Sequence, residues 1–66
     1  MRYAGLTDEP KRRKGERGNP SDFKIMQQFT SEHSARQWER RMQAQGYEAD
    51  TIGTGWKYGY TFSMRH

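Results

Sequence analysis

The stretch "TGWKYGYTFSMRH", residues 54–66, places a large apolar or aromatic side chain at every second position. These side chains are Trp56, Tyr58, Tyr60, Phe62 and Met64. Alternation with a period of two is typical of a β-strand whose two faces meet different surroundings. The row either forms one side of a hydrophobic core or offers a platform on which nucleic-acid bases stack.

The rest of the chain contributes few other core residues. Hydrophobic residues make up 30% of the 66 positions, and the mean hydropathy is −1.37. A chain of this length is near the lower limit at which one core can hold a fold. It has no cysteine, so neither a disulfide nor a thiolate metal site can support that core. We therefore expect the aromatic row to be buried against a helix.

The segment "TSEHSARQWERRMQAQG", residues 30–46, predicts that helix. Thr30 or Ser31 can accept a hydrogen bond from an unpaired N–H at its start, and Gly46 suits the left-handed conformation that ends many helices. Three residues at helical spacing form a narrow apolar stripe: Ala35, Trp38 and Met42.

Three strands are predicted around this helix. The first lies within 22–29 and the second within 47–52, and a glycine-rich connection at 53–55 leads into the third, at 56–64. The simplest α+β arrangement is a β-α-β-β domain. It has a three-stranded antiparallel sheet of order 1-3-2, with the single helix on one face.

Residues 1–20 have the composition of a disordered basic tail. The run "TDEPKRRKGERGNPSD" contains no large apolar residue, so it cannot bury enough surface to offset the entropy of ordering. Residues 1–20 hold six Lys and Arg against three Asp and Glu, and so contribute three of the four net positive charges. We therefore predict a flexible tail over 1–20 and a single domain over 21–66.

The face of the sheet opposite the aromatic row is predicted to be open. It is polar, mildly basic and small at its centre, where Gly59 would weaken a strand unless something must approach the backbone closely. We interpret it either as a solvated surface or as a binding face. Its residues would be Lys24, Met26, Gln28, Lys57, Gly59, Thr61, Ser63 and Arg65.

No group of residues predicts catalysis. His33 and His66 have no cysteine or serine–acid pair at useful spacing, and so few folded residues seldom enclose a pocket in which Glu48 and Asp50 would differ in pKa. We expect no enzymatic activity, no metal and no cofactor. No stretch is long and apolar enough for a membrane span or a secretory signal, so we expect a cytoplasmic protein that is a monomer or a weak dimer.

The isoelectric point of about 9.8 favours a partner that is nucleic acid, either DNA or RNA. In this hypothesis the tail contacts phosphates without regard to sequence, and cations of the domain add a second surface. The alternative is a protein-binding modulator or inhibitor, of the kind that viruses and plasmids encode, that docks on an acidic surface of a larger host protein. The candidate binding residues are Lys11, Arg12, Arg13, Lys14, Arg17, Lys24, Arg36, Arg40, Lys57 and Arg65.

Overall fold

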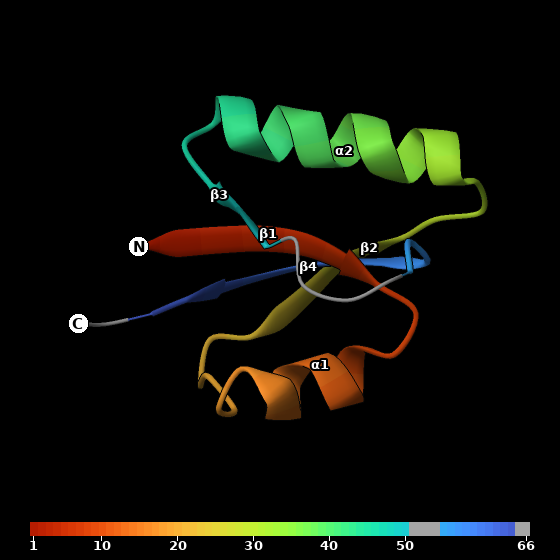
Figure 1. Cartoon of the computed structure of the whole chain (residues 1–66). Coiled ribbons are helices and arrows are strands. Elements are labelled where there is room, and N and C mark those ends of the chain that lie inside the picture. Colours follow the sequence, from red (N-terminus) through yellow and green to blue (C-terminus); the bar gives the residue numbers. More distant parts are fainter. Residues whose placement is uncertain (51–54, 65–66) are drawn as a thin grey trace.

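The computed structural model describes residues 1–50 and 55–64, and shows a four-stranded mixed sheet with one helix on each face (Figure 1). The strands follow the order β2-β4-β1-β3, in which β4 is antiparallel to β1 and β2 while β1 is parallel to β3. Along the chain the elements are β1 (Arg2–Thr7), α1 (Pro10–Glu16), β2 (Lys24–Gln28), α2 (Glu32–Ala44), β3 (Glu48–Asp50) and β4 (Tyr58–Ser63).

The predicted three-stranded antiparallel sheet, with one helix and a disordered tail, is wrong. Within the first 20 residues the chain forms both β1 and α1, and β1 lies between β4 and β3 in the sheet. The strand β1 therefore lies beside β4, in the position that was predicted for the strand at 47–52. Residues 51 and 52 of that predicted strand lie outside the described part of the chain. The reason for the error is that Ala4 and Leu6 of β1 are buried, and the charge of the segment that follows concealed this short strand.

The helix predicted over 30–46 is present as α2, and it covers the apolar face of the sheet. The hydroxyl of Ser31 caps its start by accepting the N–H of Ser34 at 3.2 Å. Gly46, at a φ of 99°, ends it. Its buried residues pack on the sheet to form one hydrophobic core, which consists of Ala4, Leu6, Phe29, Ala35, Trp38 and Met42.

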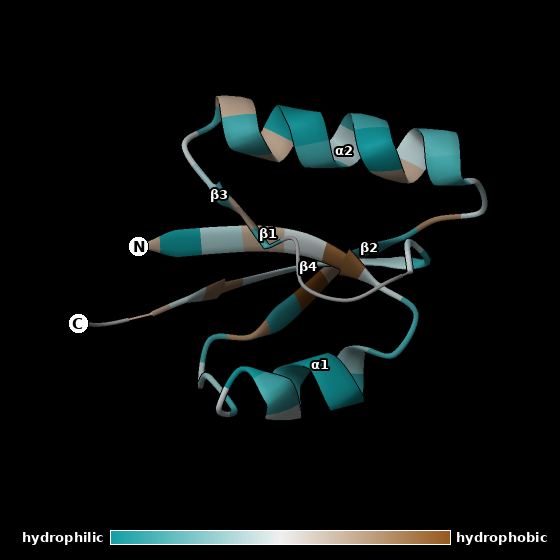
Figure 2. Ribbon diagram, in the orientation of Figure 1, coloured by the Kyte–Doolittle hydropathy of each residue, from teal (hydrophilic) through white to brown (hydrophobic). Residues whose placement is uncertain are grey.

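The face that α1 covers is aromatic rather than aliphatic. Tyr60 and Phe62 are buried there, and their rings stack with each other, with Phe23 and, for Phe62, with Tyr3. The helix α1 brings no large apolar side chain to this layer, and Figure 2 shows it as mostly hydrophilic. The centre of the aromatic row, Tyr60 and Phe62, is therefore buried, but against the segment that was predicted to be a tail. At the ends of the row, Trp56 packs beside the α2 core and Met64 is 37% exposed.

The predicted open face is wrong at its centre, which α2 covers. The residues of that face that remain exposed are Lys24, Met26, Gln28 and Lys57. Gly59 is buried, and a Cβ at that position would lie 2.8 Å from Cζ3 of Trp38 and 3.0 Å from the Phe29 ring. The close approach to the backbone is thus made by the Trp38 ring of α2. A glycine is needed here to let that helix reach the sheet.

A β-bulge in β2 explains why its sequence does not alternate cleanly. The register with β4 shifts between Ile25 and Gln27. Before the shift, Phe23 stacks on Tyr60 on the α1 face; after it, Phe29 packs against Trp38 on the α2 face. One extra residue has moved the two phenylalanines to opposite faces.

Replacement of Gly59 by alanine is expected to lower the free energy of unfolding by about 1–3 kcal/mol, because the new methyl group overlaps the Trp38 ring. Chemical denaturation followed by tryptophan fluorescence measures this change. The matched control is Gly15→Ala on α1, where a Cβ meets nothing within 4 Å; it should stabilise the protein by about 0.5–1 kcal/mol. A Gly59→Ala protein as stable as the wild type would contradict this packing.

Candidate functional site

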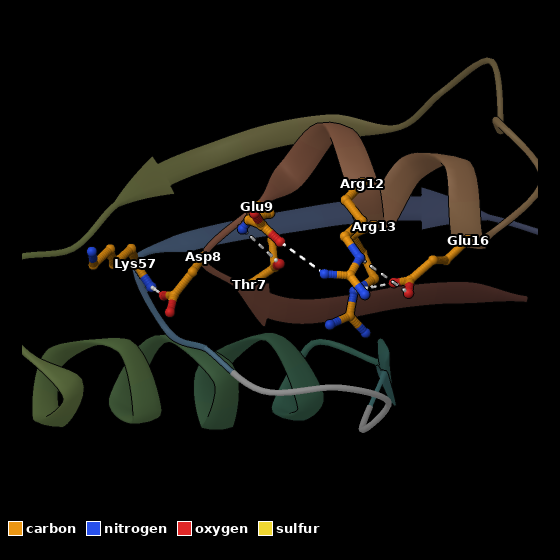
Figure 3. A pocket seen from close by; sticks show the side chains of 7 residues that line it. All are labelled: Thr7, Asp8, Glu9, Arg12, Arg13, Glu16 and Lys57. Atoms are coloured by element: carbon orange, nitrogen blue, oxygen red, sulfur yellow. Dashed lines mark hydrogen bonds and ion pairs between the residues drawn. The ribbon is translucent and has the colours of Figure 1, made fainter.

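A polar cavity of about 490 Å³ lies at the carboxyl end of β1, between α1 and the start of β4 (Figure 3). The chain leaves β1 toward the α1 face and leaves β2 toward the α2 face (Figure 1). Open α/β sheets generally bind ligands at such an edge, outside the carboxyl ends of their strands. The cavity is lined by Thr7, Asp8, Glu9, Arg12, Arg13, Glu16 and Lys57.

The turn "TDEP", residues 7–10, builds one wall of the cavity. The Thr7 hydroxyl accepts the N–H of Glu9 at 3.0 Å, and Pro10 begins the helix, a position where its missing N–H leaves no hydrogen bond unmade. The Asp8 carboxylate accepts the backbone N–H groups of Trp56 at 3.1 Å and Lys57 at 3.2 Å. The turn therefore fixes where β4 begins and where Lys57 stands at the rim.

These contacts shift the titration of Asp8. The hydrogen bonds from Trp56 and Lys57, together with the charge of Lys57, hold the pKa of the Asp8 carboxyl below its ordinary value, against a smaller opposing effect of burial. The carboxylate is therefore favoured as the charged, acceptor form at neutral pH.

Three cations and three carboxylates line the cavity, and several of them form ion pairs. Arg12 lies 3.2 Å from Glu9 and 3.8 Å from Glu16, and Nε of Arg13 lies 3.4 Å from Oε1 of Glu16. The side chain of Arg12 is 73% exposed, so its pairs add little to stability.

Arg13 differs from the other cations of the cavity because it is buried. Its side chain is 5% exposed, and its Nε and Nη1 have no hydrogen-bond partner within the described part of the chain. Buried polar atoms in native proteins are nearly always paired, so an unpaired guanidinium nitrogen calls for an explanation. It is the strongest indication of a ligand in this cavity.

Arg17, which follows α1, lies in a structural ion pair. Its Nε donates to Asp50 at 3.1 Å and its Nη2 donates to the other carboxylate oxygen. The Tyr60 hydroxyl donates to the same carboxylate. Burial raises the pKa of Tyr60, and the charges of Arg13 and Arg17 partly oppose that effect. The positive charge of Arg17 is thus largely neutralised inside the fold by the Asp50 carboxylate.

The remaining predicted binding residues are spread over both layers. Lys11 and Lys14 belong to α1, and Lys24 lies on the exposed strand β2. Arg36 and Arg40 lie on α2, across the sheet from the cavity. There Arg36 pairs with two glutamates of its own helix, Glu32 and Glu39. Arg65 lies outside the described residues.

Of the predicted set, the cavity brings together Arg12, Arg13 and Lys57. The other lining residues were missed, because positive charge selects neither carboxylates nor hydroxyls; they are Thr7, Asp8, Glu9 and Glu16. One signal was available in the sequence "TDEP", residues 7–10. A threonine and acidic residues directly before a proline are typical of the start of a helix.

No family model, no curated protein and no solved structure matches this chain. A proposal about its function must therefore be based on the site itself. Among the described residues neither helix combines the length and apolar character that a membrane span requires. The same residues contain no group of three His, Asp or Glu side chains placed to hold a metal ion. The fold and the cavity together define a small α+β protein with a mixed-charge site at one edge of its sheet.

The role of Asp8 predicts a pH dependence of stability. Because its pKa is lower in the folded chain than in the unfolded one, where it is about 3.9, Asp8 adds stability above that pH and loses it as the pH falls through the folded value. The difference in unfolding free energy between wild type and Asp8→Asn should be largest near neutral pH and shrink toward zero in acid. Urea denaturation at a series of pH values measures it, with Glu48→Gln as the control for loss of an exposed carboxylate. A difference that does not change with pH would contradict the role of the charge.

Proposed function

We propose that this protein is a small, non-enzymatic nucleic-acid-binding protein whose contact surface is the outer side of α1 and the mouth of the cavity. The observation that carries the proposal is the charge of α1. Its sequence, "PKRRKGE", holds four cations against one carboxylate within seven residues. Such a helix is about 10 Å long, and duplex DNA carries one negative charge for about every 1.7 Å of its axis, so these cations can meet several phosphates.

The four cations of α1 have different surroundings. Lys11 is exposed and Lys14 is half-buried, and neither has an ion-pair partner among the described residues. Arg12 is tied to two glutamates, and Arg13 faces the cavity from a buried position. We infer that Lys11 and Lys14 supply attraction that does not depend on sequence, and that the cavity supplies a closer contact.

Neutralising Lys11 and Lys14 together is expected to weaken binding to single- and double-stranded DNA and RNA. Two lost phosphate contacts should lower the slope of log affinity against log salt by about 2. Fluorescence anisotropy of labelled oligonucleotides between about 50 and 200 mM salt measures this slope.

The control for this experiment is Arg40→Gln with Arg41→Gln, which removes the same charge from α2, in the other layer. It should change the slope less than the α1 variant does. Absence of binding by the wild type at low salt would refute the proposal. Equal losses in the two double variants would show that net charge matters and the surface of α1 does not.

A second candidate function is docking to a protein through the edge of the sheet. All five residues of β2 are exposed, including Ile25 at 48% and Met26 at 45%, and the strand has a ladder partner, β4, on one side. An exposed edge of this kind can accept an extended strand from another protein. Lys24 gives it a positive charge that suits an acidic partner.

For this second candidate, Ile25→Asp is expected to abolish recovery of one stoichiometric protein in a nuclease-treated pull-down. The aspartate puts a negative charge at the edge where the partner's strand and its acidic groups would dock. The α1 variant Lys11→Gln with Lys14→Gln should retain the same protein. Recovery of that protein by both variants would exclude the β2 edge as the contact.

A further inference from the structure

Two nitrogens of the Arg13 guanidinium lack a hydrogen bond, although the Glu16 carboxylate lies beside them. Oε1 of Glu16 lies 3.4 Å from Nε of Arg13, and Oε2 of the same carboxylate lies 3.8 Å from Nε of Arg12. A good hydrogen bond between a guanidinium and a carboxylate is about 2.7–2.9 Å long. Glu16 therefore stands between two guanidinium groups without hydrogen-bonding to either.

The two sides of this contact differ in exposure. The Glu16 side chain is 46% exposed and Arg12 is 73% exposed, so both can turn away from the mouth. Arg13 is buried and its position is set by the helix. The other carboxylates of the cavity are already engaged, Asp8 with the backbone just before β4 and Glu9 with Arg12. Glu16 is thus the anion that an incoming ligand can replace.

We propose that Arg13 and Arg12 form a binding site for the terminal phosphate of a nucleic-acid strand, and that Glu16 occupies this site until the phosphate displaces it. Lys57 lies at the opposite rim of the cavity, and its side chain points away from the two arginines (Figure 3). This inference rests on the proposed function and deepens it by naming the part of the nucleic acid that enters the cavity.

The depth of Arg13 favours a terminal phosphate over one within the strand. A phosphate inside a strand carries a sugar on both sides, and these hinder its oxygens from reaching a side chain that is 5% exposed. A terminal phosphate presents three oxygens at the end of the strand and carries about −1.5 to −2 charges. It therefore replaces the single charge of Glu16 with a stronger acceptor for both guanidinium groups.

The test compares two strands of one sequence, with and without a terminal phosphate, and measures the ratio of their affinities. The wild type should prefer the phosphorylated strand. Glu16→Gln should raise that ratio by roughly tenfold, the effect of one charge-assisted hydrogen bond, because the competing carboxylate is gone. Arg13→Gln should bring the ratio to about one, and Arg12→Gln should lower it.

Charge-matched controls separate the site from the net charge. Glu48→Gln on β3 makes the same change in charge as Glu16→Gln, and Arg41→Gln on α2 matches the two arginine variants. Neither control should alter the ratio. Circular dichroism checks that Arg13→Gln folds; the opposite effects of Glu16→Gln and Arg12→Gln, at exposed positions, test the site even if it does not.

The outcomes distinguish this inference from the proposed function. If no strand binds, both are overturned. If strands bind with a ratio of one in the wild type and in Glu16→Gln, the terminal-phosphate site is wrong and the proposed function stands. If inorganic phosphate or a nucleoside monophosphate competes as well as the phosphorylated strand, the cavity binds free phosphate compounds and the strand end is excluded as its ligand.

Discussion

The buried carboxylate of Asp50 is the contact on which the arrangement of the α1 layer depends. It accepts hydrogen bonds from Arg17, which follows α1, and from Tyr60 in β4, while it belongs itself to β3. The strand β1 lies between β3 and β4 in the sheet, so it must leave room for the Asp50 carboxylate and the Tyr60 hydroxyl. A Cβ at Gly5 of β1 would lie 2.6 Å from the Tyr60 hydroxyl and 3.0 Å from Cβ of Asp50, so glycine at that position lets the three elements meet.

This ion pair compensates for what α1 lacks. The helix has no large apolar side chain to hold it on the sheet, so its attachment depends on Arg17 and Asp50, and on the Arg17 guanidinium over the Phe62 ring at 5.9 Å. Loss of one partner of a buried pair is strongly destabilising, because the other charge stays buried. A helix attached in this way can keep its remaining surface basic, and that surface is available for a ligand.

How far the sequence predicts this structure depends on the range of the contacts. Local patterns located α2 from its cap and its stripe of Ala35, Trp38 and Met42, because these depend on neighbouring residues. They missed α1, since its anchor lies 33 positions away at Asp50. They also assigned the wrong helix to the aromatic row, because period two shows that a strand has two faces and not which element covers each. In the site, charge composition pointed to Arg12, Arg13 and Lys57, but the acidic residues that position them carry no such signal.

Two kinds of cation thus stand on the same two-turn helix, and salt acts on them differently. Exposed charges such as that of Lys11 are screened within about 8–10 Å at physiological ionic strength, so their attraction for phosphates weakens steeply as salt rises. Arg13 is shielded from solvent, so a contact with it is screened much less. A ligand that uses only the lysines should be released by salt, whereas one that also reaches Arg13 should keep part of its affinity. The affinity that remains at high salt therefore measures the contribution of the cavity, separately from that of the net charge of the chain.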